Sequence, residues 1–230
     1  MESSLLSAHA ISRHLEVLVE ETGEPVVLIG NSRGALPVAD VALRRPDLVR
    51  GVVLVASNTL APASANTPRD FYVRAYADPP KVLDEEFVRR EPEMNSFSLD
   101  HLDPEFVDGR RAAAMDSGWW ADSEHRLRVY ADVTQPSLEQ MRSRCLESLN
   151  GKGFSIPVLQ VWGHNDVSAP VELANDLFRL LASGGGQATS VVINRSAHYV
   201  YREHASGFMA LLHNFSEAIA GSSQSAAEIP

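Results

Sequence analysis

Four short apolar runs constrain the fold of this 230-residue chain more than any other feature. They read PVVLIG (25–30), GVVLVAS (51–57), PVLQVWG (157–163) and TSVVIN (189–194). Each run is continuous and rich in β-branched residues, which is typical of a strand buried on both faces of a parallel sheet. Helical patterns alternate with them, over about 4–21, 33–45, 171–183 and 204–219. This alternation predicts an α/β fold with a mostly parallel sheet and flanking helices.

The segment from 58 to 150 breaks this rhythm, because it is polar, contains many prolines and carries helical pieces such as DPEFVDGRRAAAM. In that piece, Asp103 precedes Pro104 and is expected to cap a helix whose first residue is the proline. We therefore predict a helical cap over 58–150, inserted into a core formed by 1–57 and 151–220. The first helix is expected to begin after Ser3 or Ser4 and to stop at Gly23. The small, polar tail 221–230 predicts disorder.

Composition excludes several classes of protein. The formal net charge of −10 and the absence of a basic run argue against a nucleic-acid partner. Cys145 is the only cysteine, so an intrachain disulfide and a cysteine metal cluster are excluded, and a reducing cytoplasm is expected. No signal peptide or run of transmembrane length is recognisable, which predicts a protein that does not bind membranes. The sequence implies neither a metal nor an organic cofactor.

The first apolar run leads into GNSRG (30–34), a G-x-S-x-G pattern. Alone this pattern is weak, but here it joins a buried strand to a helix, the context in which Ser32 would lie on a sharp turn as a nucleophile. Gly30 and Gly34 suit such a turn, because a side chain at either position is expected to collide with the neighbouring strand or helix. The alternative is that Ser32 is an inert residue of a glycine-rich turn.

A serine nucleophile needs a base, and the base needs an orienting acid. Asp166 follows the third apolar run and His198 follows the fourth. The order Ser, Asp, His, each after a separate strand, predicts a catalytic triad. The alternatives are that Asp166 is a turn or capping residue and that His198 is an ordinary surface histidine.

With these residues in place, the chain from 4 to about 219 resembles the α/β-hydrolase superfamily and, in detail, the meta-cleavage product hydrolases, which split a carbon–carbon bond of dienoic ring-fission products. Asn31 in GNSRG, the segment HYVYREH with Tyr199, and LDPEFVDGRRAA with Arg110 carry the closer resemblance. The resemblance implies a partial α/β-hydrolase fold and a serine hydrolase acting on a small carbonyl substrate. It implies these roles: His198 as base, Asp166 as its orienting acid, Ser32 as nucleophile or activator of water, the Arg33 amide as oxyanion donor, and Asn31, Tyr199 and Arg110 as substrate-binding residues, with Arg110 on a carboxylate.

Two other functions remain open. One is an esterase, a thioesterase or a biosynthetic tailoring enzyme on the same triad. The other is a non-catalytic pseudoenzyme or binding protein that keeps the pocket but lacks a complete oxyanion hole. Arg110 has its own alternative, a solvated position on a helix surface.

The resemblance does not extend to the strands and the His-Gly loop that precede the first helix in complete relatives. In those relatives the loop supplies the second oxyanion donor, so weak activity is expected here. A coding start placed too late would also explain why the strands and the loop are missing from this sequence. The run 26–30 would have a neighbouring strand on one side only. An uncovered strand edge predicts either a homodimer across it or an N-terminal helix that covers it.

Overall fold

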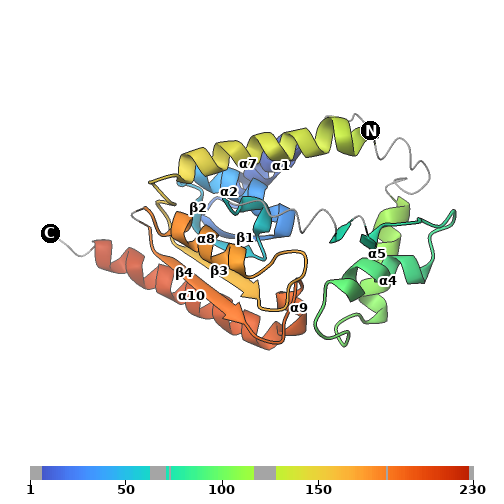
Figure 1. Cartoon of the computed structure of the whole chain (residues 1–230). Coiled ribbons are helices and arrows are strands. Elements are labelled where there is room, and N and C mark those ends of the chain that lie inside the picture. The colour runs from blue at the N-terminus through green and yellow to red at the C-terminus, as the bar shows by residue number, and fades with distance from the viewer. Residues whose placement is uncertain (1–6, 63–70, 73, 117–127, 185, 228–230) are drawn as a thin grey trace.

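The computed structural model describes residues 7–62, 71–72, 74–116, 128–184 and 186–227 (Figure 1). The elements in these ranges are α1 (Ala8–Glu21), β1 (Val26–Asn31), η2 (Ser32–Gly34), α2 (Ala35–Arg44), β2 (Val49–Val55), η3 (Asn58–Leu60), α4 (Glu85–Met94), α5 (Pro104–Asp116), η4 (Tyr130–Thr134), α7 (Gln135–Leu149), β3 (Val158–Gly163), α8 (Glu172–Leu181), β4 (Ala188–Ile193), α9 (Val200–Glu203) and α10 (Ala205–Ala227). All four predicted strands are present, each within two residues of its expected start.

The four strands form one parallel sheet in the order β1-β2-β3-β4. Their carboxyl ends are in register, since Asn31 pairs with Val55, and Val55 pairs with Val161. Buried valines and leucines fill β2 and β3, as expected for strands covered on both faces. The predicted α/β fold with a parallel sheet is confirmed.

Helices cover both faces of the sheet. Figure 1 shows α1, α2, α7 and α8 on one side and α10 on the other. The long helix α10 packs closely on β2, because a Cβ atom at Gly51 would lie 2.5 Å from the Ile219 side chain. Because β1-α2-β2 and β3-α8-β4 run in the same direction across the sheet, right-handed crossovers place α2 and α8 on the same face.

Helix α7 lies within the predicted cap segment but packs on the core. Met141, Cys145 and Leu149 are buried in the main hydrophobic cluster, and the Ser137 hydroxyl accepts a hydrogen bond from the Ala8 amide at 2.9 Å. Helices α4 and α5 pack on each other away from this layer (Figure 1). Within the described ranges, α4 and α5, and not α7, therefore make up the part that lies beyond the carboxyl ends of the strands.

Helix ends follow local chemistry. Ser7 caps α1, since its hydroxyl accepts from the Ala10 amide at 3.2 Å, whereas Ser3 and Ser4 lie outside the described residues. Gly23 follows α1 with φ +73°, as expected for a helix stop. Asp103 caps α5 as predicted, because its carboxylate accepts from the Phe106 amide at 2.8 Å. Helix α10 continues to Ala227, into the segment predicted to be disordered.

Strand β1 is an edge of the sheet. Within the described part of the chain it pairs only with β2, as the sequence predicts. Helix α1 packs on α2 and α7, and Ile29 of β1 remains 49% exposed. None of the described helices is apolar over a stretch long enough to cross a membrane.

Candidate active site

Ser32 lies at a strained turn directly after β1. Its φ of +52° is in the left-handed region, which a non-glycine residue seldom adopts. Gly30 permits this turn, because a Cβ atom there would lie 2.6 Å from the Gly34 carbonyl oxygen. The expectation for Gly34 is wrong: a Cβ atom at that position would meet nothing within 4 Å. The Thr59 hydroxyl donates to the Ser32 carbonyl at 2.9 Å and holds the turn against η3.

Asp166 follows β3 and is buried with its carboxylate fully bonded. Its Oδ1 accepts from the Ser168 amide at 2.9 Å, the Ser168 hydroxyl at 3.0 Å and the Ala169 amide at 2.7 Å. Three donors on one oxygen fix the plane of the carboxylate and direct Oδ2 toward the next strand. Asp166 therefore forms the turn that the alternative interpretation expects, and the same turn aims its second oxygen at a histidine.

That histidine is His198, which follows β4 and is only 4% exposed. Its Nδ1 lies 2.7 Å from Asp166 Oδ2 and 3.1 Å from the Ser168 hydroxyl. A proton on Nδ1 that is donated to the carboxylate leaves Nε2 as an acceptor, the tautomer that a general base requires. The loop that carries His198 crosses the end of β3, where a Cβ atom at Gly163 would lie 2.2 Å from the Ala197 carbonyl oxygen.

The three predicted triad residues thus follow the carboxyl ends of β1, β3 and β4, at the same end of the strands. Asp166 and His198 are in contact. Among the hydrogen bonds of the described residues, none joins the Ser32 hydroxyl to His198. Contacts between nucleophile and base are often long in a free enzyme and tighten when substrate binds.

Asn31 and Arg33 flank Ser32. The Asn31 amide nitrogen donates to the carbonyl oxygens of Val55 at 3.3 Å and His198 at 3.5 Å, and so ties β1 to β2 and to the histidine loop. The Arg33 amide belongs to the first turn after the strand, where backbone N–H groups lack intrahelical acceptors. The guanidinium of Arg33 lies over two aromatic rings, 5.4 Å from the Tyr72 centroid and 5.5 Å from that of Tyr130.

Arg110 lies on α5 and is engaged by a buried carboxylate. Its Nη2 is 3.0 Å from Oε2 of Glu91, a residue of α4 that is 5% exposed. The same oxygen accepts from the Tyr199 hydroxyl at 2.8 Å, and Arg110 Nη1 lies 3.4 Å from that hydroxyl. Burial and the nearby Glu91 carboxylate raise the pKa of Tyr199 well above its ordinary value. This polar network extends to His198 through Asn95, which follows α4: its side-chain amide donates to Glu91 Oε1 at 3.0 Å, and its backbone carbonyl accepts from the His198 amide at 3.1 Å.

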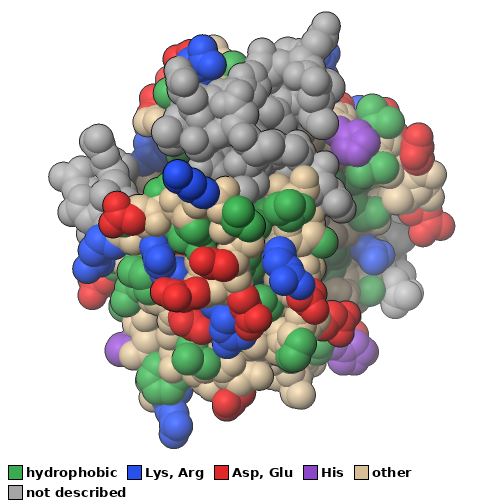
Figure 2. Space-filling model, turned by 90° about the vertical axis from the view of Figure 1, so that its right-hand side faces the viewer, with side chains coloured by type: hydrophobic (Ala, Val, Ile, Leu, Met, Phe, Trp, Pro, Cys, Tyr) green, Lys and Arg blue, Asp and Glu red, His purple; other side chains and the backbone are tan. Residues whose placement is uncertain are grey.

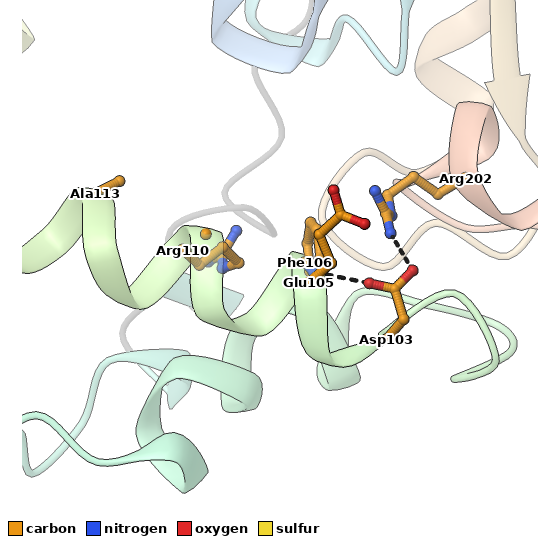
Figure 3. A pocket seen from close by; sticks show the side chains of 7 residues that line it. Asp103, Glu105, Phe106, Arg110, Ala113 and Arg202 are labelled. Atoms are coloured by element: carbon orange, nitrogen blue, oxygen red, sulfur yellow. Dashed lines mark hydrogen bonds and ion pairs between the residues drawn. The ribbon is translucent and has the colours of Figure 1, made fainter.

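A hollow of about 500 Å³ opens over α5 on the outer side of this network. Figure 3 shows Arg110, Phe106 and Arg202 lining it, with Arg202 bonded to Asp103. Among the described side chains on the face drawn in Figure 2, basic and acidic groups are interleaved rather than gathered in a patch of one sign. In the described ranges, no three His, Cys, Asp or Glu side chains gather as metal ligands.

The sequence analysis does not name three residues of the site. For Ser168 a signal exists, since a serine two residues after an aspartate often closes a local turn on its carboxylate. Glu91 and Asn95 carry no such signal, because their roles depend on how α4 packs against the histidine loop.

The sheet, the flanking helices and the turn, acid and histidine at one end of the strands define the class of an α/β-hydrolase. Residues 3–211 match the family described as Alpha/beta hydrolase family, and the chain belongs to that family.

Two kinds of relative are similar to this chain. A pimeloyl-(acyl-carrier protein) methyl ester esterase of Yersinia pseudotuberculosis is 25% identical over 210 residues, which cover 91% of this chain and 76% of the relative. A putative lipase of Acinetobacter baumannii superposes with TM-score 0.69 at 19% identity, and the match covers 94% of this chain and 69% of the lipase chain. The meta-cleavage product hydrolase of Pseudomonas fluorescens IP01 superposes with TM-score 0.65 at 17% identity, covering 92% and 72%. At these identities the two solved structures show a shared fold.

Proposed function

We propose that this protein is a serine hydrolase that cleaves carboxylic esters, with Ser32 as nucleophile, His198 as base and Asp166 as orienting acid. The observation that carries the proposal is the buried Asp166–His198 pair, with Oδ2 and Nδ1 2.7 Å apart, at the same end of the strands as the strained turn at Ser32. The similarity to methyl ester esterases favours an ester over the carbon–carbon bond of a dienoic substrate.

The proposed reaction begins when His198 Nε2 takes the proton of the Ser32 hydroxyl as its oxygen attacks the ester carbonyl. The Arg33 amide donates to the developing oxyanion. His198 then returns the proton to the leaving alcohol, and an acyl-serine forms. A water molecule, deprotonated by the same histidine, attacks the acyl-serine and releases the acid. Asp166 stays ionised throughout and stabilises the imidazolium.

Carbon–carbon bond hydrolysis is the second candidate, with Asn31, Tyr199 and Arg110 around the substrate as in the family that the sequence resembles. The observed contacts give these side chains other partners. Asn31 donates to backbone carbonyls, and Tyr199 and Arg110 both bond to Glu91. Carboxylate binding by Arg110 would share or replace that ion pair, which makes this candidate the weaker one.

A fluorophosphonate probe tests the proposed nucleophile. The wild-type protein should label, Ser32→Ala should not, and the matched control Ser143→Ala, which removes an exposed hydroxyl of α7, should label at the wild-type rate. Turnover of p-nitrophenyl esters beside dienoic ring-fission products then separates the two reactions. A folded wild type that neither labels nor turns over any of these substrates would favour a binding protein and overturn the proposal.

A further inference from the structure

The side chain of Arg33 is a cation fixed beside the proposed nucleophile. It follows Ser32 in the chain, so the two Cα atoms are roughly 3.8 Å apart. The central carbon of its guanidinium lies over the rings of Tyr72 and Tyr130, 5.4 and 5.5 Å from their centroids. An arginine stacked on aromatic faces keeps its N–H donors free at the edge of its plane. The two rings therefore orient the group without using its hydrogen-bonding capacity.

Arg33 differs in this respect from the other arginines near the site. Arg110 is paired with Glu91 at 3.0 Å, and Arg202 with Asp103 at 3.0 Å. No carboxylate within the described ranges forms an ion pair with Arg33, although the chain as a whole carries a net charge of −10. A cation that has no such partner among the described residues, next to the reacting group, suits an anion brought by the substrate.

The backbone around Ser32 brings Arg33 close to the histidine loop. Asn31, on the other side of Ser32, donates to the His198 carbonyl oxygen at 3.5 Å, and the Thr59 hydroxyl donates to the Ser32 carbonyl oxygen at 2.9 Å. Residues 31–33 therefore lie beside the loop that carries His198, and an anion bound to the Arg33 side chain would lie near the Ser32 hydroxyl.

We propose that the Arg33 side chain binds a carboxylate on the acyl part of the substrate, and so selects half-esters of short dicarboxylic acids. This inference rests on the proposed esterase function and names its substrate class. The position next to Ser32 limits the distance from the anion to the reacting carbonyl to a short carbon chain. An anionic group at the far end of a long carrier arm would lie beyond its reach.

Steady-state kinetics with two matched esters test the inference. The anionic substrate is p-nitrophenyl hydrogen adipate, and the neutral one is its methyl-capped counterpart, methyl p-nitrophenyl adipate. We expect the wild type to prefer the anionic ester. Arg33→Met should lower the ratio of kcat/KM for the anionic to the neutral ester by roughly 10-fold or more, chiefly through KM, since hydrogen bonds to charged groups are of that strength. Arg33→Lys should keep part of the preference, and added salt should reduce it in the wild type.

The control variant is Arg111→Met, which removes an exposed cation of α5 paired with Asp108 at 2.7 Å. It makes the same change in net charge and should leave the ratio at its wild-type value. A wild type that does not prefer the anionic ester, or an Arg33→Met variant with an unchanged ratio, would overturn the inference.

A binding experiment separates this inference from the proposed function. Monomethyl adipate is titrated by calorimetry into the Ser32→Ala protein, with and without Arg33→Met, after thermal unfolding has shown that both are folded. Binding that is lost with Arg33→Met supports the carboxylate site even if no ester is hydrolysed. Equal binding by both proteins, or binding by neither, contradicts it whatever the esterase assay gives.

Discussion

Asp166→Asn should separate the chemistry of the site from its stability. The substituted side chain keeps one oxygen, which can still accept from the amides of Ser168 and Ala169, now at 2.9 and 2.7 Å from Oδ1. Its new NH₂ group then faces His198 Nδ1, which is 2.7 Å from Oδ2 in the native protein. Nδ1 must become the acceptor of that bond, so the proton moves to Nε2. The histidine would then have no lone pair available for the Ser32 hydroxyl.

The expected loss of activity is large and the expected loss of stability is small. A histidine held in the wrong tautomer in this arrangement lowers kcat by about 10⁴-fold. The hydrogen bonds persist in number but lose their charge-assisted part, so the free energy of unfolding should fall by about 1 kcal/mol.

The assay compares kcat for a p-nitrophenyl ester, the rate of fluorophosphonate labelling and the urea unfolding midpoint. Asp176→Asn, at a half-exposed position of α8, removes the same charge without touching the site and should match the wild type in all three. Suppose that Asp166→Asn retains activity within tenfold of the wild type while Ser32→Ala has none. Asp166 would then not orient the base, and the proposed triad would be refuted.

Three further predictions concern the cap and the sheet edge. Glu91→Ala leaves Arg110 without its buried partner and should lower the free energy of unfolding by about 3 kcal/mol, and adding Arg110→Met should recover part of the loss in chemical denaturation. Burial lowers the pKa of His101 below 6.5, so the unfolded chain binds the proton more readily and stability should fall as the pH drops below 6.5; His101→Gln should flatten that slope in thermal unfolding at several pH values. A homodimer across the edge of β1 should appear in light scattering and should dissociate in Ile29→Lys, whereas a stable wild-type monomer would contradict it.

The sequence predicts the sheet and the order of the site residues for one physical reason. Continuous β-branched runs form buried parallel strands, and the carboxyl ends of parallel strands lie at the same end of the sheet. Ser32, Asp166 and His198 therefore had to meet there once the strands were recognised. Gly34 was misjudged because the pattern treats its two glycines alike, whereas only Gly30 is approached closely by another backbone segment.

The cap resisted prediction because its roles depend on tertiary packing. The sequence allows Arg110 to be a ligand of a substrate carboxylate or a solvated residue. Neither interpretation predicts its ion pair with Glu91, which lies on a different helix. The placement of α7 was missed for a similar reason. Its apolar residues Met141, Cys145 and Leu149 recur every four residues within a largely polar stretch, and only contact with α1 and α2 reveals them as part of the core.

Hydrogen bonds of Glu203 link the loop after α4 to the loop that carries His198. With one oxygen, Glu203 accepts from the amides of Phe97 and Ser98, in the loop that follows α4, at 2.9 and 3.0 Å. Its other oxygen accepts from the Ala197 amide at 2.9 Å, directly before His198. One half-buried carboxylate thus joins the residues after α4 to the loop that carries His198. Because Glu203 bonds to both segments, the position of the loop after α4 and that of the His198 loop depend on the same side chain.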